Sequence, residues 1–240
     1  MRQKTLFGMG LLAVLIFSVG CASYSPSLVR LDTHGPTAGR QAGGDLTVYV
    51  EEFATLEKSE KGFDTDLVKE GVLPLLVLVE NNGQHPYTVK TMDIVVLDQN
   101  TNTALRPLTP EETAKRAKRN AITRALGWSM IVPIITIPVA VTASAIHTSK
   151  VNKQITLDFS AKAFSDASVM PKKNHSGFVF FELPKGRKDL SGLALQLTSG
   201  NEATGESLTL ISSLPSATFK PVKVTPDLSV RKENREEGNR

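Results

Sequence analysis

Residues 73–79 read LPLLVLV, an apolar run with no polar side chain. A short run of this kind is typical of a β-strand that is buried on both faces. Pro74 must lie at the start of the strand or at a bulge, because proline has no N–H to donate to a neighbouring strand. The triplet Asn81-Asn82-Gly83 then provides strong turn chemistry. The run therefore predicts a doubly buried strand in a β-rich domain.

Further candidate strands lie on both sides of a long middle segment, and turn residues separate them. They are residues 46–53 (LTVYVEEF), 87–97 (YTVKTMDIVVL), a short stretch around 104–108, 176–183 (SGFVFFEL), 193–198 (LALQLT) and 207–212 (SLTLIS). Residues 55–70 are polar and irregular by comparison. Short strands with regular turn signals indicate a mainly β fold, a β-sandwich over residues 46–214. Of Phe178, Phe180 and Phe181, most are expected in the core.

The middle segment, about residues 110–163, predicts a helical insert in this domain. Thr109 can cap a helix, Pro110 suits its first position, and the acidic pair Glu111-Glu112 suits its positive end. After a basic stretch, residues 125–149 carry no formal charge apart from His147. A second amphipathic helix is predicted from the fourfold spacing of Val151, Ile155, Phe159 and Ala163.

The apolar segment 125–149 is long enough to cross a bilayer, which takes about 20 residues. Pro133 and Pro138 interrupt it, and basic residues flank both ends. Three interpretations stay open: a helical hairpin packed on its own domain or on another copy, a dip into the lipid leaflet, and a single crossing that splits the fold. In the contact interpretations, the side chains that touch lipid or a protein partner are Trp128, Met130, Ile131, Val132, Ile134 and Ile135.

The chain opens with MRQKTLFGMGLLAVLIFSVGCAS. Arg2 and Lys4 form a positive head, an apolar stretch too short for a comfortable span follows, and small residues precede Cys21, the sole cysteine. This order is typical of an export signal peptide, which we expect to cover residues 1–20.

The tetrad Ser18-Val19-Gly20-Cys21 resembles the lipobox of bacterial lipoproteins, although that family usually has Leu where Ser18 stands. The resemblance implies cleavage before Cys21 and acylation of its thiol (a palmitate-type lipid) and of its amino group. Two or three acyl chains give durable anchoring. In that family an Asp directly after the cysteine favours inner-membrane retention. With Ala22 there instead, the resemblance implies an outer-membrane lipoprotein facing the periplasm, or the outer face of the cell membrane in a cell with one membrane. Residues 21–45, rich in Gly, Ser and Pro, are expected to be a flexible tether, and the charged residues 215–240 a disordered tail.

The stretch 152–184 (NKQITLDFSAKAFSDASVMPKKNHSGFVFFELP) resembles bacterial envelope lipoproteins with an immunoglobulin-like domain. The match lies in Asn152, Lys162, Pro171, Gly177 and residues 178–181. The resemblance implies an immunoglobulin-like β-sandwich with an inserted helical segment. It supplies no catalytic residues.

The rest of the sequence offers no catalytic, cofactor or metal motif. Its four histidines are scattered, and its formal charge of +4 falls to +2 once Arg2 and Lys4 leave with the leader, so no dense basic face for nucleic acid is indicated. We therefore expect a membrane-associated, non-enzymatic protein with a binding, assembly or structural role, without a cofactor beyond the lipid on Cys21. The alternative is an oligomeric membrane-active or export accessory component built from the apolar inserts.

Overall fold

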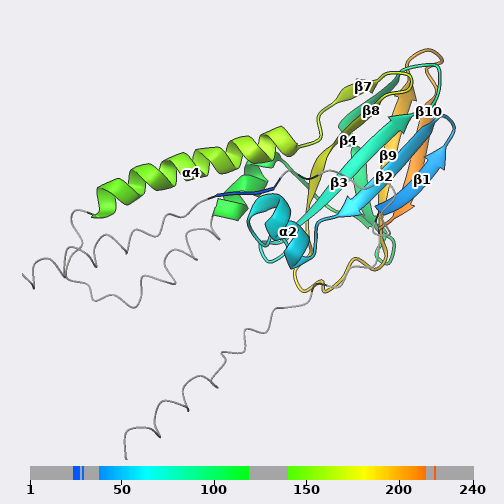
Figure 1. The fold of residues 1–240 in the computed structure, drawn as a ribbon. Helices are drawn as coiled ribbons and strands as arrows, with labels where there is room; N and C mark the ends of the chain where they lie inside the picture. The colour runs from blue at the N-terminus through cyan, green and yellow to red at the C-terminus, as the bar shows by residue number, and fades with distance from the viewer. Residues whose placement is uncertain (1–23, 28, 30–37, 119–139, 215–218, 220–240) are drawn as a thin grey trace, which may run out of the picture.

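The computed structural model describes residues 24–27, 29, 38–118, 140–214 and 219. Within these residues the strands form two five-stranded antiparallel sheets, which pack face to face (Figure 1). Sheet A has the order β1 (Ala38–Gly43), β2 (Leu46–Glu52), β3 (Val72–Asn81), β8 (Asn174–Glu182) and β6 (Pro107–Leu108). Sheet B has the order β10 (Ser207–Ser213), β9 (Leu193–Asn201), β4 (Tyr87–Asp98) and β5 (Thr103–Ala104), with β7 (Ala167–Val169) also paired to β4.

The main core lies between the two sheets. Strand β3 contributes Leu73, Leu75, Val77 and Val79 to it, all fully buried. Because neighbouring side chains of a strand point to opposite faces, Val72 and Leu76 of β3 face away from this core. They are buried too, in a second core on the outer face of sheet A. The predicted burial of this strand on both faces is confirmed, although Leu78 is only partly buried.

Pro74 occupies the place in β3 where its missing N–H costs least. It is the third residue of β3, and its carbonyl accepts a hydrogen bond from the Phe53 N–H (2.9 Å), one residue beyond the end of β2. The proline therefore removes a donor only where the partner strand is already ending.

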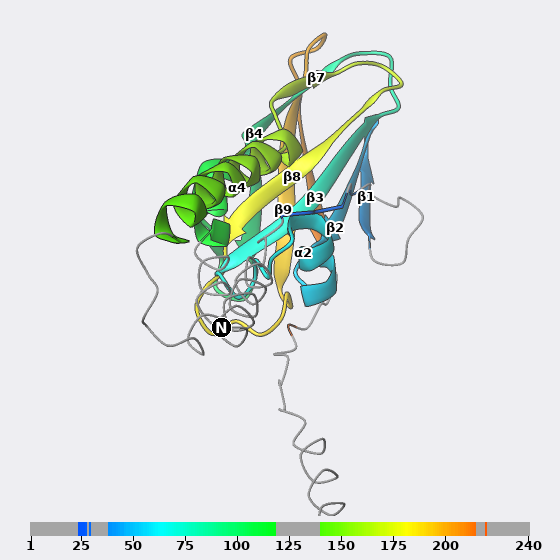
Figure 2. The same cartoon turned by 60° about the vertical axis from the view of Figure 1, so that its left-hand side comes forward.

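The second core lies between sheet A and a helical layer. This layer contains α2 (Leu56–Phe63), a helical segment over residues 110–118 and α4 (Ala140–Lys162). Figure 2 shows α2 in front of β3 and α4 beside β8. Strand β8 divides its aromatic side chains between the cores: Phe178 and Phe180 face the helices, and Phe181 faces sheet B. The expectation that most of these phenylalanines lie in the core is confirmed, and in fact all three are buried.

Strands on the two sides of the insert share both sheets. In sheet A, β3 pairs with β8 over nine residue pairs, and in sheet B, β4 pairs with β9. A single membrane crossing between residues 118 and 140 would place these partners on opposite sides of a bilayer. The split-fold interpretation is therefore wrong, and the insert returns to the side that it leaves.

Three local expectations need correction. The tether predicted for residues 21–45 is too long, because Ala38–Gly43 form β1 and pair with β2. The polar stretch 55–70 contains α2. The short strand expected around 104–108 is two separate strands, β5 in sheet B and β6 in sheet A, so the chain changes sheets there.

Strand β4 is interrupted by a large bulge. Val89 is opposite Ser199 of β9, and Ile94 is opposite Leu197, so residues 90–93 of β4 face a single residue of β9. A residue outside β4 and β9 holds the bulge: Asp166 Oδ1, just before β7, accepts a hydrogen bond from the Thr91 N–H (2.7 Å). The sequence predicts an unbroken strand here, and the bulge leaves Met92 79% exposed.

Candidate functional site

The helical layer on sheet A contains the two ends of the insert. We call these ends its roots: the first is residues 110–118, and the second is the C-terminal part of α4. Its interior is apolar and rich in phenylalanine. The buried residues are Phe53, Phe63, Leu67, Val72, Leu76, Leu108, Ala114, Ala117, Ile155, Phe159, Phe178 and Phe180. The described residues on either side of 119–139, namely 110–118 and α4, belong to this layer, so its packing fixes where the insert begins and ends.

Helix α2 is a short helix with strong local signals at both ends. The Thr55 side chain accepts a hydrogen bond from the Lys58 N–H (3.4 Å) and caps its start, and Asp64 ends it in the left-handed conformation at φ 54°. Lys58 Nζ also lies 3.0 Å from the buried carboxylate of Glu52. This ion pair ties α2 to the end of β2.

The first root of the insert, residues 110–118, begins with a capping box. The Thr109 hydroxyl accepts from the Glu112 N–H (3.1 Å), and the Glu112 carboxylate accepts from the Thr109 N–H (3.0 Å). The hydrogen bond from the Thr109 backbone, followed by the one from Arg106, lowers the pKa of Glu112. The predicted helix start at Thr109 is confirmed.

Ion pairs attach this first root to the end of β8. Glu182 accepts hydrogen bonds from Arg106 Nε (2.7 Å) and from Arg116 (2.6 Å), and Arg116 also donates to the Gly71 carbonyl (3.1 Å). The hydrogen bonds from Arg106 and Arg116 lower the pKa of Glu182 to about 2. The root is therefore held by packing on one side and by a charged cluster on the other.

The second root is the C-terminal part of α4. Ile155 and Phe159 are buried, and Val151 and Ala163 pack at the edge of the same core, so the predicted amphipathic spacing is confirmed. The Phe159 ring stacks on Phe63 of α2 with 5.0 Å between ring centroids.

Polar contacts join the two roots to each other and to α2. Lys118 Nζ donates to the Thr156 hydroxyl (2.6 Å), which brings the two ends of the insert side by side. Lys162 Nζ donates to the Gly62 carbonyl (2.7 Å) and to Asp158 (2.7 Å). The insert thus leaves and re-enters the domain at one place on the outer side of sheet A.

A segment from the N-terminal part of the chain lies on the same layer. We call residues 24–27 and 29 the strap. The Tyr24 hydroxyl donates to Asp158 Oδ2 of α4 (2.6 Å), and the Ser27 N–H donates to the Lys61 carbonyl of α2 (2.9 Å). Tyr24 and Val29 pack against the helical core. Burial and the neighbouring Asp158 raise the pKa of Tyr24, so its hydroxyl keeps the proton that it donates.

The sequence-predicted site residues lie outside the described residues: Cys21, and the contact residues Trp128, Met130, Ile131, Val132, Ile134 and Ile135. The structure instead describes what flanks them, the strap after Cys21 and the two roots around the apolar segment. Tyr24 and Asp158 were not singled out by the sequence; an aromatic residue within a Gly/Ser/Pro-rich stretch was the available signal. Among the described helices, none combines the length and the apolar character that crossing a membrane requires.

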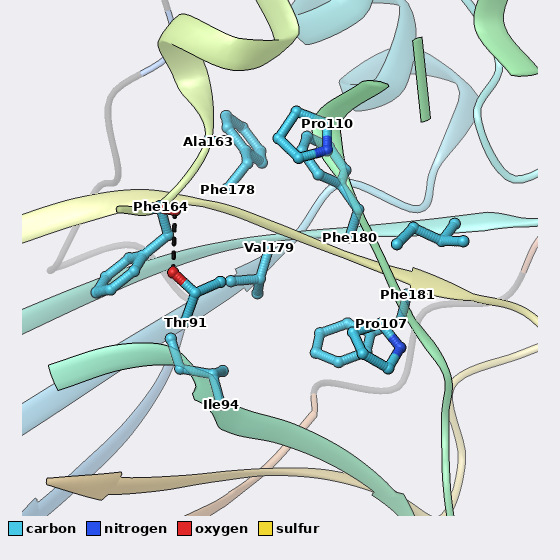
Figure 3. Close-up of a pocket in the computed structure, with 11 residues that line it drawn as sticks. Thr91, Ile94, Pro107, Pro110, Ala163, Phe164, Phe178, Val179, Phe180 and Phe181 are labelled. Atoms are coloured by element: carbon cyan, nitrogen blue, oxygen red, sulfur yellow. Dashed lines mark hydrogen bonds between the residues drawn. The ribbon is translucent and has the colours of Figure 1, made fainter. Parts of the chain in front are cut away.

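A small apolar cavity opens beside the helical layer, where β6, β8 and the residues after α4 meet the bulge of β4 (Figure 3). Phe164, Phe178 and Phe180 are among its lining residues, and the Thr91 hydroxyl at its wall already donates to the Phe164 carbonyl (3.3 Å). Its volume is about 50 Å³, against about 300–1,000 Å³ for ordinary small-molecule sites. The cavity does not offer a ligand site of that kind.

The part of the chain that the structure describes contains no group of three or more His, Cys, Asp or Glu residues arranged to hold a metal ion. Its ion pairs and polar clusters, such as those around Glu182, around Asp158 and between Arg187 and Asp98, join different parts of the fold. The clusters around Glu182 and Asp158 hold the helical layer in place.

No protein-family model matches the chain, and no curated protein matches it. Two solved structures resemble it weakly. The yjhA protein from Bacillus subtilis matches with a TM-score of 0.35 and 11% identity, over 71% of this chain and 93% of that one. A protein described as "putative lipoprotein (ycdA)" from Bacillus subtilis matches with a TM-score of 0.33 and 15% identity, over 72% of this chain and 38% of that one. Likenesses at this level do not establish a shared function.

Proposed function

We propose that this protein is a lipid-anchored cell-envelope protein with a non-catalytic binding, assembly or structural role. The observation that carries the proposal is that the strap, which follows Cys21 in the chain, and both roots of the insert pack on one face of sheet A. A lipid on Cys21 and the apolar segment 125–149 would therefore reach the same surface. Ala22 favours the outer membrane, with the domain in the periplasm.

We further propose that the two sheets are a variant of the immunoglobulin-like β-sandwich. Support comes from the resemblance of residues 152–184 to envelope lipoproteins of that kind, and from the face-to-face packing of two antiparallel sheets around the main core. The insert of about residues 110–163, whose two ends pack in the helical layer, is then the element that distinguishes this variant.

The apolar segment has the role of a second contact in this proposal. Exposed apolar surface costs about 25 cal/mol per Å² in water, so side chains such as Trp128, Ile131 and Ile135 need a cover. An anchor that already holds the domain near a leaflet raises the effective concentration of any lipid or partner beside the segment. Lipid or an envelope partner, including a second copy, is the proposed cover.

Palmitate labelling tests the anchor. Wild-type protein expressed in a bacterium with a lipoprotein pathway should take up labelled palmitate and fractionate with the outer membrane. Cys21→Ser should take up none and stay soluble or unprocessed. Wild-type protein that carries no label would contradict the proposal.

A charge within the apolar segment tests the contact. In a Cys21→Ser background, Ile131→Glu or Ile135→Glu should weaken membrane association or self-association without lowering the melting temperature. Gln154→Glu, on the exposed side of α4, is the matched control and should change neither. If the domain itself covers the segment, the same charges should instead cost several kcal/mol of stability, about 2–7 per buried polar group, and leave association unchanged.

A further inference from the structure

We propose that the strap holds the domain against its anchor in one orientation, with the helical layer facing the lipid surface and the outer face of sheet B turned away from it. This inference rests on the proposed acylation of Cys21. It replaces the flexible tether expected from the sequence with a docked segment.

The strap is bound along its length to two helices. Tyr24 reaches α4 through its hydrogen bond to Asp158, and its ring is half-buried against the helical core. Asp158 is in turn held by Lys162 (2.7 Å). Ser27 is bonded through its backbone to α2, and Val29 packs on the same core. The Ser25 N–H also donates to the Asp64 carboxylate at the end of α2 (3.4 Å). The Tyr24 side chain and two backbone N–H groups thus join the strap to different elements of the layer.

The length of free chain decides the orientation. Cys21 precedes Tyr24 by three residues, which span at most about 10 Å when fully extended. Without the strap the first held residue would be Ala38, seventeen residues after Cys21, and a flexible chain of that length has a typical end-to-end distance of about 20–25 Å. Packed layers lie about 10 Å apart, so the outer face of sheet B is about 20 Å farther from the anchor than the helical layer is.

The exposed side of the helical layer fits the headgroup region. It carries exposed Lys115, Lys153 and Leu157 together with exposed Glu57 and Glu111. A basic side chain near an anionic leaflet contributes about 1 kcal/mol, and the acidic side chains offset part of this gain. Because mixed charge alone gives weak attraction, the short connection to Cys21 is what keeps this face on the lipid.

Energy transfer to the lipid headgroups measures the orientation. The full lipidated protein is placed in phosphatidylethanolamine/phosphatidylglycerol vesicles that contain a headgroup-labelled acceptor lipid. A donor dye is attached through Leu157→Cys on the outer side of α4, or through Ile211→Cys on the outer face of sheet B; these positions are 57% and 49% exposed. The acylated thiol of Cys21 does not react, so each variant carries one dye.

We expect transfer from position 157 to be at least twofold greater than from position 211. Tyr24→Ala should remove most of this difference, and Tyr24→Phe, which keeps the ring and loses the hydrogen bond to Asp158, should remove part of it. Ser25→Ala, an exposed neighbour in the strap, should preserve it. Melting curves show whether each variant is folded. If Tyr24→Ala does not fold, Tyr24→Phe alone tests the role of the strap.

The outcomes separate the two proposals. Equal transfer from both positions in palmitate-labelled wild type would overturn the orientation while leaving the anchor intact. A difference that survives both Tyr24 substitutions would overturn the role of the strap. Wild-type protein that takes up no palmitate would instead overturn the proposed function.

Discussion

Phe159 and Leu157 lie two positions apart on α4 and meet opposite surroundings. Phe159 is fully buried between Phe63 and Phe180, whereas Leu157 is 57% exposed. A helix turns about 100° per residue, so two positions place the side chains on nearly opposite sides. A few buried side chains therefore account for most of what the packing of the second root contributes to the free energy of unfolding. Each of them can be substituted separately.

Phe159→Ala should lower the free energy of unfolding by about 3–5 kcal/mol, because it leaves a cavity between α2 and β8. Leu157→Ala, on the same helix, should change it by no more than about 0.5 kcal/mol. Urea unfolding of the soluble Cys21→Ser protein measures both. Equal effects would show that α4 does not pack on sheet A as described.

Glu182 is expected to make the attachment of the first root depend on pH. Its folded-state pKa, about 2, lies below the value of about 4.3 for a free glutamate, because Arg106 and Arg116 stabilise its charge. The ion pairs therefore stabilise the fold fully above about pH 4.3, and the contribution is lost as the pH falls towards 2.

Between pH 5 and pH 2, the stability of Glu182→Gln should fall less steeply than that of the wild type. Glu111→Gln removes an exposed carboxylate of the same helical segment and should keep the wild-type slope. Urea unfolding at stepped pH gives the slopes, and NMR titration of the Glu182 carboxyl gives its midpoint. A midpoint near 4.3 would contradict the ion-pair geometry.

At the scale of elements, the strands with bulky alternating side chains could be predicted, and the elements without them could not. Residues 73–79 and 176–183 have enough apolar and β-branched side chains to specify buried strands. Strand β1 (AGRQAG) has no bulky apolar or β-branched side chain. It forms because it pairs with the edge of β2 over six residue pairs. Tyr24 was missed for a similar reason, since only tertiary contacts distinguish it from a linker residue.

The roots of the insert should be separable from its apolar segment. Replacing residues 125–149 with a Gly/Ser linker should leave a β-rich domain that melts cooperatively, because Ile155 and Phe159 stay in place. Extending the replacement to residue 162 removes both side chains and exposes Phe63 and Phe178, so cooperative melting should be lost. Circular dichroism melting compares the two.

A loss of cooperativity with the shorter replacement would show that the apolar segment is itself part of the core. In that case the contact role proposed for Ile131 and Ile135 would have no basis. The two replacements therefore distinguish a structural segment from one that is free to meet lipid or a partner.

At the scale of the whole molecule, the pairing of β3 with β8 and of β4 with β9 joins the two halves of the chain into one body. The sequence favoured a return of the insert, because neither half has enough strands to form a domain alone, but it left a single crossing open until the strand pairing excluded it. It could not show that the insert leaves and returns beside the segment that follows Cys21. That proximity depends on Lys118, Thr156 and Tyr24, whose contacts are long-range in the sequence.

In the proposed arrangement, lipid or another chain, and not the protein's own sheets, covers the apolar segment of a lipid-anchored domain. The most direct measurement is crosslinking in intact cells from a photoreactive amino acid in place of Trp128, with the same probe at Ile211 as the control. We expect adducts with lipid or with a second polypeptide from position 128, and few from position 211. Adducts from position 128 that lie only within the same chain, on its own strands, would contradict it.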